Sequence, residues 1–143
     1  TLDRQKANVD DAYSWYRLRS IPGVGKILGL ILLYEIHDIK RFPRVQDFVS
    51  YCRLVKCPRE SAGKKFGTKN SKIGNAHLKW AFSEAACLFL RGNEQAQHYH
   101  ARLVSKYGKG KALSILAHKI GRAAYFMLKR KEPFSMKAFF NET

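Results

Sequence analysis

Apolar residues recur along most of the chain at the spacing of an amphipathic helix, whereas alternation with a period of two is weak everywhere. The clearest stripe lies between Lys111 and Arg130 and consists of Leu113, Leu116, Ala117, Ile120, Ala124, Tyr125 and Leu128. Because a strand requires the alternation that is missing, the sequence predicts an all-α fold. A chain of 143 residues is too short for two self-sufficient cores, so we expect a single compact helical domain.

Glycine, proline and capping residues divide this pattern into segments. Pro43 suits a first helical turn, Asn75 is a good N-cap, and Pro133 is expected to close the last helix. The segments predict helices over residues 2–17, 27–36, 43 to about 54, 76 to about 90, 94–106 and 111–130. Between the third and fourth of these lies a long lysine-rich loop, residues 55–75, which is compatible with a small hairpin.

The chain is strongly basic, with 27 Lys and Arg against 11 Asp and Glu and a net charge of +16. Residues 48–143 hold nineteen of the basic side chains and only five of the acidic ones. Ordinary solvated helices mix both signs to form pairs along their surface, but residues 102–131 contain nine basic groups and no acid. A solvated face is the plain alternative, yet this pattern favours a nucleic-acid backbone as partner.

Other classes receive little support. No apolar stretch is long enough to span a membrane and the N-terminus is charged, so an intracellular, soluble protein is expected. The three cysteines lack the spacing of a disulfide framework or a zinc site, and the carboxylates after residue 47 are isolated, so no metal site is assigned. A serine hydrolase is also disfavoured because the chain has no GxSxG motif.

Residues 21–25, Ile-Pro-Gly-Val-Gly, lie between two predicted helices and match the hairpin of a helix-hairpin-helix unit. Gly23 and Gly25 permit a tight turn and a close approach of a phosphate, and the first N–H groups of the next helix, beginning near Lys26, point toward an anion. Such contacts would hold a nucleic-acid backbone without reading its sequence. The alternative is a plain glycine-rich turn between packed helices.

Ser61 is placed among cations, with Arg59 before it and Lys64 and Lys65 after it. A phosphoryl-transfer transition state needs a nucleophile with fixed positive charge around the phosphoryl oxygens. By itself this pattern is more typical of a turn or capping serine. The neighbouring lysines that we assign to phosphate binding are Lys69, Lys72 and Lys79.

Several ordered motifs resemble one family. They are Ser-Ile-Pro-Gly-Val-Gly ending at residue 25, Tyr-Glu-Ile-His-Asp at 34–38, Phe42, Pro58, Glu-Ser-Ala-Gly-Lys at 60–64, Ser-Lys-Ile-Gly-Asn at 71–75, Leu78-Lys79 and Ala85-Ala86. Over residues 18–90 the chain is similar to the C-terminal domain of the insertion-sequence 110/116/902 transposases, to which the Piv-type DNA invertases are related.

The resemblance implies that Ser61 attacks a DNA phosphodiester and forms a covalent link, together with a DEDD carboxylate set that holds Mg²⁺ in an N-terminal domain absent from this chain. It also implies a structured guide RNA and a homo-oligomer in the full-length protein, located in the bacterial cytoplasm on nucleoid DNA. Residues 1–17 would end a helical linker, and residues 18–143 would form the transposase domain with its helix-hairpin-helix (18–37) and basic loop (55–75). The fragment alone is expected to be inactive.

This chain departs from the family in three places. Arg53-Leu54 stands where Gly-Leu is usual, which is expected to alter the turn entering the loop; Ala62 stands where glycine is common; and Lys79 replaces a frequent arginine. Two other interpretations stay open: a non-catalytic helix-hairpin-helix module that binds DNA or RNA, and a ribosome-like binder of folded RNA. Beyond residue 91 only the basic helical pair points to a role.

Overall fold

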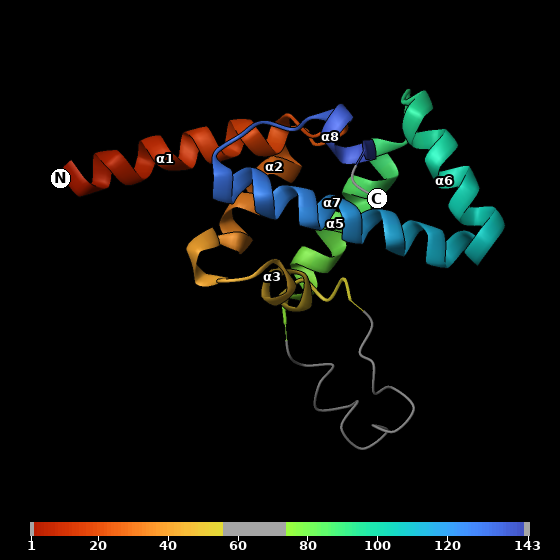
Figure 1. The fold of residues 1–143 in the computed structure, drawn as a ribbon. Coiled ribbons are helices and arrows are strands. Elements are labelled where there is room, and N and C mark those ends of the chain that lie inside the picture. The colour runs from red at the N-terminus through yellow and green to blue at the C-terminus, as the bar shows by residue number, and fades with distance from the viewer. Residues whose placement is uncertain (1, 56–73, 142–143) are drawn as a thin grey trace, which may run out of the picture.

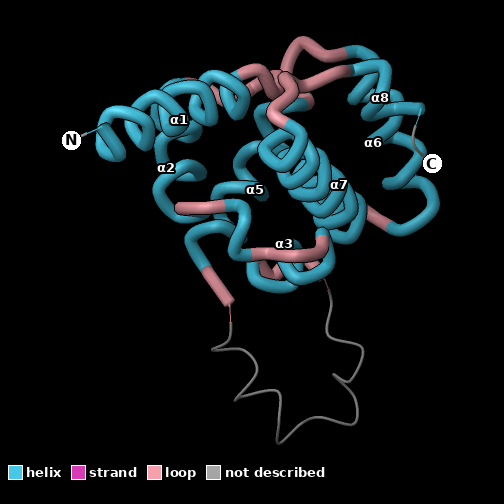
Figure 2. The backbone as a smooth tube through the Cα atoms, turned by 60° about the vertical axis from the view of Figure 1, so that its left-hand side comes forward, coloured by secondary structure: helices cyan, strands magenta, loops and turns pink. Residues whose placement is uncertain are grey.

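The computed structural model describes residues 2–55 and 74–141 (Figure 1). Its elements are α1 (Leu2–Arg19), α2 (Lys26–Ile36), the 3₁₀ turn η1 (Ile39–Arg41), α3 (Val45–Tyr51), α5 (Ala76–Phe89), α6 (Glu94–Tyr107), α7 (Lys109–Arg130) and α8 (Met136–Asn141). Figure 2 shows helices and connecting loops and no strand in this part of the chain, which confirms the all-α prediction. None of the described helices is long and apolar enough to cross a membrane.

Helix α7 is the centre of the packing and contacts α1, α3, α5, α6 and η1, while α2 packs between α1 and α5 (Figure 1). The stripe predicted for α7 accounts for this position. Leu116, Ile120 and Ala124 are completely buried, and Tyr125 and Leu128 nearly so. Most of the other helices therefore bury their apolar side chains against this one long amphipathic helix.

Phe48 of α3 is the hub of the core at one end of the domain. Its ring lies 5.2 Å from that of Phe42, 6.0 Å from that of Phe82 on α5 and 5.6 Å from that of Tyr125 on α7. The Tyr125 hydroxyl also donates a buried hydrogen bond of 2.8 Å to the carbonyl oxygen of Phe42. Rings and hydrogen bond together fix the segment around α3 on α5 and α7.

A second aromatic cluster holds α8, a helix that the sequence pattern did not predict. Phe89, at the end of α5, lies 5.8 Å from the ring of Phe134, 5.1 Å from that of Phe139 and 6.3 Å from that of Phe140. The hydroxyl of Ser20 accepts a hydrogen bond of 2.8 Å from the Phe134 N–H. With six residues, α8 is too short to display helical periodicity, and tertiary contacts of its phenylalanines stabilise it.

The helix predicted from Pro43 to about Leu54 is shorter in the structure, and Pro43 lies outside it. Arg44 is the N-cap, and its backbone N–H donates to the Asp47 carboxylate at 3.2 Å. The helix ends after Tyr51, and the N–H groups of Arg53 and Leu54 close it by donating to the carbonyls of Ser50 and Val49.

Arg53 adopts a φ of +57° in this closing turn. That is the conformation in which glycine has no steric penalty. A glycine at this position, as in the Gly-Leu pair of the resemblance, would adopt the turn without a steric penalty, whereas arginine carries the backbone cost. Whether the arginine alters the turn relative to the family stays a prediction.

The turn at residues 21–25, which matches a helix-hairpin-helix hairpin in sequence and keeps that name only as a prediction, packs against the C-terminal end of α5. Ile21 is fully buried and Val24 nearly so, whereas Gly23 has a φ of +93°. A Cβ atom on Gly23 would lie 2.6 Å from the carbonyl carbon of Leu88 and 2.8 Å from the nitrogen of Phe89. At Gly25 the same atom would meet nothing within 4 Å, and φ is −91°. Glycine is thus required for packing at the first position only.

We predict that Gly23→Ala lowers the free energy of unfolding by about 2–4 kcal/mol, because both the backbone conformation and the α5 backbone oppose a methyl group. Gly25→Ala is the matched control and should cost about 0.5–1 kcal/mol, the difference between glycine and alanine at an N-cap. Urea unfolding followed by circular dichroism measures both. Equal losses in the two variants would contradict the packing assigned to Gly23.

Candidate nucleic-acid interface

The residues assigned from the sequence to phosphate binding and catalysis fall into two groups. Gly23, Gly25, Lys26 and Lys79 belong to the described residues. The others lie outside them, and their assignments stay predictions: Arg59, Ser61, Lys64, Lys65, Lys69 and Lys72.

The N-terminus of α2 is an open helix end. Gly25 is its N-cap and carries no side chain that could satisfy the first N–H groups of the helix. Lys26, the first helical residue, is exposed, and so is Ile27, with 74% of its surface accessible. Backbone amides, a lysine and unobstructed space at Gly25 are suited to an anion such as a phosphate.

A cation that the sequence analysis did not assign lies beside this helix end. The Arg19 guanidinium is stacked over the Trp15 ring, 4.7 Å from its centroid, and Trp15 donates from Nε1 to the carbonyl oxygen of Lys26 at 3.2 Å. The Cγ atom of Arg19 lies 3.1 Å from the Cβ position of Gly29 on α2. The four-residue spacing of Trp15 and Arg19 just before the hairpin is the signal that could have identified it.

Lys79 lies at the other end of the domain. It is exposed in the second turn of α5, next to Trp80, which is 52% exposed. Gly23 contacts the α5 backbone at Leu88, nine residues further along the helix, which is roughly 14 Å at 1.5 Å per residue. The structure therefore does not bring Lys79 and the hairpin into one cluster but places them toward opposite ends of α5.

Asn75 joins the described residues on the two sides of the segment 56–73. Its backbone N–H donates to the carbonyl oxygen of Tyr51 at 2.7 Å, and its side chain accepts from the Leu78 N–H at 3.0 Å, capping α5 as predicted. A Cβ atom on neighbouring Gly74 would lie 2.7 Å from the same Tyr51 oxygen. The chain therefore leaves α3 and enters α5 at almost the same point.

The Asn75 side chain also anchors a small polar cluster. Its Nδ2 atom donates to Glu35 of α2 at 2.9 Å and lies 3.5 Å from the Tyr51 hydroxyl oxygen. The Arg41 guanidinium lies 5.2 Å from the centre of the Tyr51 ring. Hydrogen bonds from Asn75 and Arg41 lower the pKa of Tyr51. The sequence predicted a role for only one member of this cluster, Asn75, as a helix cap. Glu35 lies in the motif Tyr-Glu-Ile-His-Asp at 34–38, which carries part of the family resemblance.

Few negative charges counter the basic side chains. Between described residues, one ion pair is formed, by Arg44 and Asp47 at 3.3 Å. The same residues contain no group of three or more histidine, cysteine or acidic side chains that could hold a metal ion. The resemblance implies Mg²⁺ in a separate N-terminal domain, so we derive no step through a metal from the residues described here.

We predict that Asn75→Asp lowers stability at neutral pH by about 1–2 kcal/mol, because a second carboxylate would face Glu35 while the helix cap is kept. Repulsion by Glu35 raises the pKa of the introduced carboxyl group in the folded state above its unfolded value. The folded state then binds more protons as the pH falls, and the deficit relative to the wild type should shrink between pH 7 and pH 4.

Asn93→Asp is the control, since Asn93 caps α6 in the same way and its side-chain amide donates to the Met136 sulfur rather than to a carboxylate. It should be close to neutral at both pH values. Urea unfolding at pH 7 and pH 4 measures the differences. A deficit in Asn75→Asp that does not change with pH would contradict the Glu35 contact.

Comparison with known proteins gives two matches. Residues 16–101 match the family model described as Transposase IS116/IS110/IS902 family. The chain is also 28% identical over 133 residues to the transposase for insertion sequence element IS1111A of Coxiella burnetii (strain RSA 493 / Nine Mile phase I). That match covers 90% of this chain and 35% of the relative, so the chain spans about a third of the relative's length. No solved structure matches. With more than half of its residues matched by the family model, the chain belongs to the IS116/IS110/IS902 transposase family.

Proposed function

We propose that this chain is the DNA-binding, nucleophile-bearing domain of a transposase, in which Ser61 attacks a DNA phosphodiester. The observation that carries the proposal is family membership together with the position of Ser61 in a segment with basic neighbours at Arg59, Lys64 and Lys65. Recognition of a structured RNA, self-association and Mg²⁺ bound by a further domain belong to the proposal at the level of the full-length protein.

In the proposed step the Ser61 Oγ atom forms a bond to phosphorus as one phosphorus–oxygen bond of the strand breaks. The serine proton is transferred to a base or to the departing oxygen, which leaves as a strand-end hydroxyl. Negative charge increases on the phosphoryl oxygens, and the guanidinium of Arg59 with the ammonium groups of Lys64 and Lys65 would stabilise it. The product is a protein–DNA phosphodiester that retains the energy of the original linkage.

The described residues on either side of the serine segment support this role, because a hydrogen bond joins them. Asn75 and Tyr51 are joined by a backbone hydrogen bond, so the described residues on the two sides of the segment 56–73 are held together where α3 ends and α5 begins. A nucleophile needs a fixed position relative to the strand that it attacks. We assign Asn75 a positioning role for this reason.

Two described regions would hold the DNA backbone. One is the open N-terminus of α2 with Lys26 and Arg19, and the other is the exposed pair Lys79 and Trp80 on α5. Because the two regions are separated along α5, they would contact different phosphates of the same strand or of the same groove edge. A non-catalytic binding module would use the same surfaces, and only the behaviour of Ser61 separates the two functions.

We predict that Ser61→Ala in the full-length transposase abolishes the covalent protein–DNA adduct and leaves DNA affinity within about threefold, because the hydroxyl is the attacking group and carries no charge. Denaturing gel electrophoresis with end-labelled target DNA detects the adduct, and fluorescence anisotropy measures affinity. Ser50→Ala, at an exposed serine of α3, is the control and should form the adduct normally. An adduct that survives Ser61→Ala would contradict the catalytic assignment and favour the binding module.

We predict that Lys26→Ala weakens duplex DNA binding by about 3–10-fold at physiological salt and reduces the slope of log affinity against log salt by about 0.9, the value for one lost phosphate contact. Lys106→Ala removes one positive charge at an exposed site on α6, a helix that packs against α7, and should leave the slope nearly unchanged. Anisotropy titrations between 50 and 200 mM salt provide both slopes. The same slope in wild type and Lys26→Ala would remove the α2 N-terminus from the interface.

A further inference from the structure

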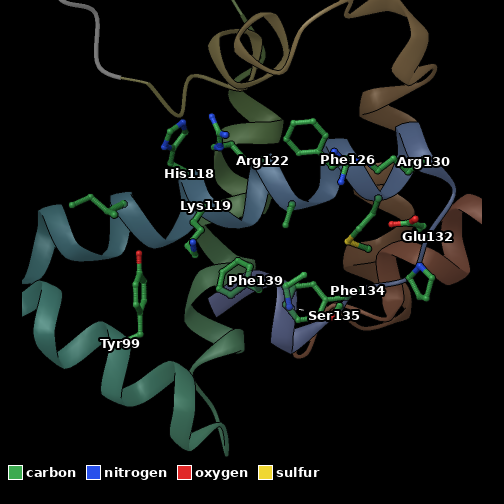
Figure 3. A pocket seen from close by; sticks show the side chains of 15 residues that line it. Tyr99, His118, Lys119, Arg122, Phe126, Arg130, Glu132, Phe134, Ser135 and Phe139 are labelled. Atoms are coloured by element: carbon green, nitrogen blue, oxygen red, sulfur yellow. Dashed lines mark hydrogen bonds between the residues drawn. The ribbon is translucent and has the colours of Figure 1, made fainter. Parts of the chain in front are cut away.

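A groove runs along the face of α7 that the packing leaves accessible, and it lies almost entirely outside the residues matched by the family model (Figure 3). It encloses about 410 Å³, within the range of small-molecule and nucleotide sites. Its walls are α7, the turn that follows it and α8, with Tyr99 contributed by α6. The sequence pattern favours a nucleic-acid backbone for the basic residues 102–131 as a whole, and the proposed function gives this groove no role.

The charge of the groove is mostly positive. Arg122 and Arg130 are exposed on α7 and line it together with Lys119, whereas Glu132 at its end is the one acid among the lining residues. Neither arginine is paired with a described carboxylate, because the one ion pair between described residues is that of Arg44 and Asp47. Burial and the neighbouring Arg122 lower the pKa of half-buried His118, so the positive charge of the groove is carried by the two arginines and Lys119.

Aromatic rings form the rest of the walls. The Lys119 ammonium lies 5.0 Å from the centre of the Phe139 ring and 5.7 Å from that of Tyr99. Arg130 lies over Phe126 at 4.7 Å, and Phe126 is only half-buried. Figure 3 shows Tyr99 reaching toward α7 from α6, and Lys119 directed toward Phe139. Two of the three basic side chains that line the groove, Lys119 and Arg130, therefore lie against its aromatic rings.

This combination selects one ligand chemistry. Phosphates satisfy the arginines, and planar bases satisfy the rings, at about 1–3 kcal/mol for each stacked base. In a duplex the bases are stacked on one another and cannot reach a protein ring, whereas single-stranded segments present unstacked bases. An acidic peptide would satisfy the arginines but leave the aromatic walls without a planar partner.

We propose that the α7 groove binds a single-stranded segment of nucleic acid, with phosphates at Arg122 and Arg130 and a base stacked on Phe126. The inference is independent of Ser61 and of the α2 N-terminus. DNA and RNA strands share the recognised chemistry, and the test includes both. The groove would allow the domain to hold an unpaired strand while its other surfaces hold duplex.

The test titrates the 143-residue chain into fluorescein-labelled 12-nucleotide single strands of DNA and of RNA at about 150 mM salt. Arg122→Ala should weaken binding of the preferred strand about 5–20-fold and reduce the salt slope by about 0.7, the value for one phosphate on a single strand. Lys129→Ala is the matched control, because Lys129 is exposed on the same helix but does not line the groove, and it should change affinity less than twofold. Equal losses in the two variants would overturn the proposal.

A second readout tests stacking. A strand containing 2-aminopurine should lose fluorescence on binding, and Phe126→Leu, which keeps apolar bulk but removes the ring, should remove most of that quenching. Thermal unfolding of each variant confirms that the fold is intact. Unchanged quenching in Phe126→Leu, or displacement of the strand by a poly-glutamate peptide at equal charge concentration, would each overturn the proposal. Ser61→Ala should bind the strands as the wild type does, so this test and the adduct assay fail separately.

Discussion

The packing of α5 against α7 is the contact on which the other features depend. Leu78, Ala81, Phe82, Ala85 and Phe89 of α5 are all completely buried, so the helix has little freedom to slide or rotate. Its N-terminal end joins the flanks of the segment 56–73 through Asn75, and its C-terminal end supports the hairpin through the close approach at Gly23. The apolar core therefore determines how far apart the two polar regions lie.

The net charge of +16 imposes a second constraint. With one ion pair between described residues, the folded chain is held by apolar and aromatic contacts while its cations are left to the surface. Such self-repulsion costs stability in isolation and is relieved when a polyanion binds. Several cations, such as Arg19, Arg130 and Lys119, rest on aromatic rings, which orients them without neutralising their charge.

Helical periodicity and capping signals predicted most of the fold. The long stripe of α7 and the Asn75 cap were confirmed, because both follow from local sequence. Pro43 was wrongly placed inside a helix, since the choice between Pro43 and Arg44 as the start depends on the Asp47 carboxylate reaching back to the Arg44 N–H. Helix α8 and the Glu35–Asn75–Tyr51 cluster depend on contacts between distant residues, which a local pattern does not contain. The same holds for the α7 groove, whose rings come from α6, α7, α8 and the connection before α8.

The central claim is that a serine of this chain becomes covalently joined to a DNA strand. The most direct measurement is mass spectrometry of the adduct trapped with full-length protein and target DNA, after digestion of both components. The account predicts a single modified peptide in which the nucleotide is attached through phosphate to Ser61. A nucleotide on any other residue, or a strand cleaved with no protein attached, would contradict it.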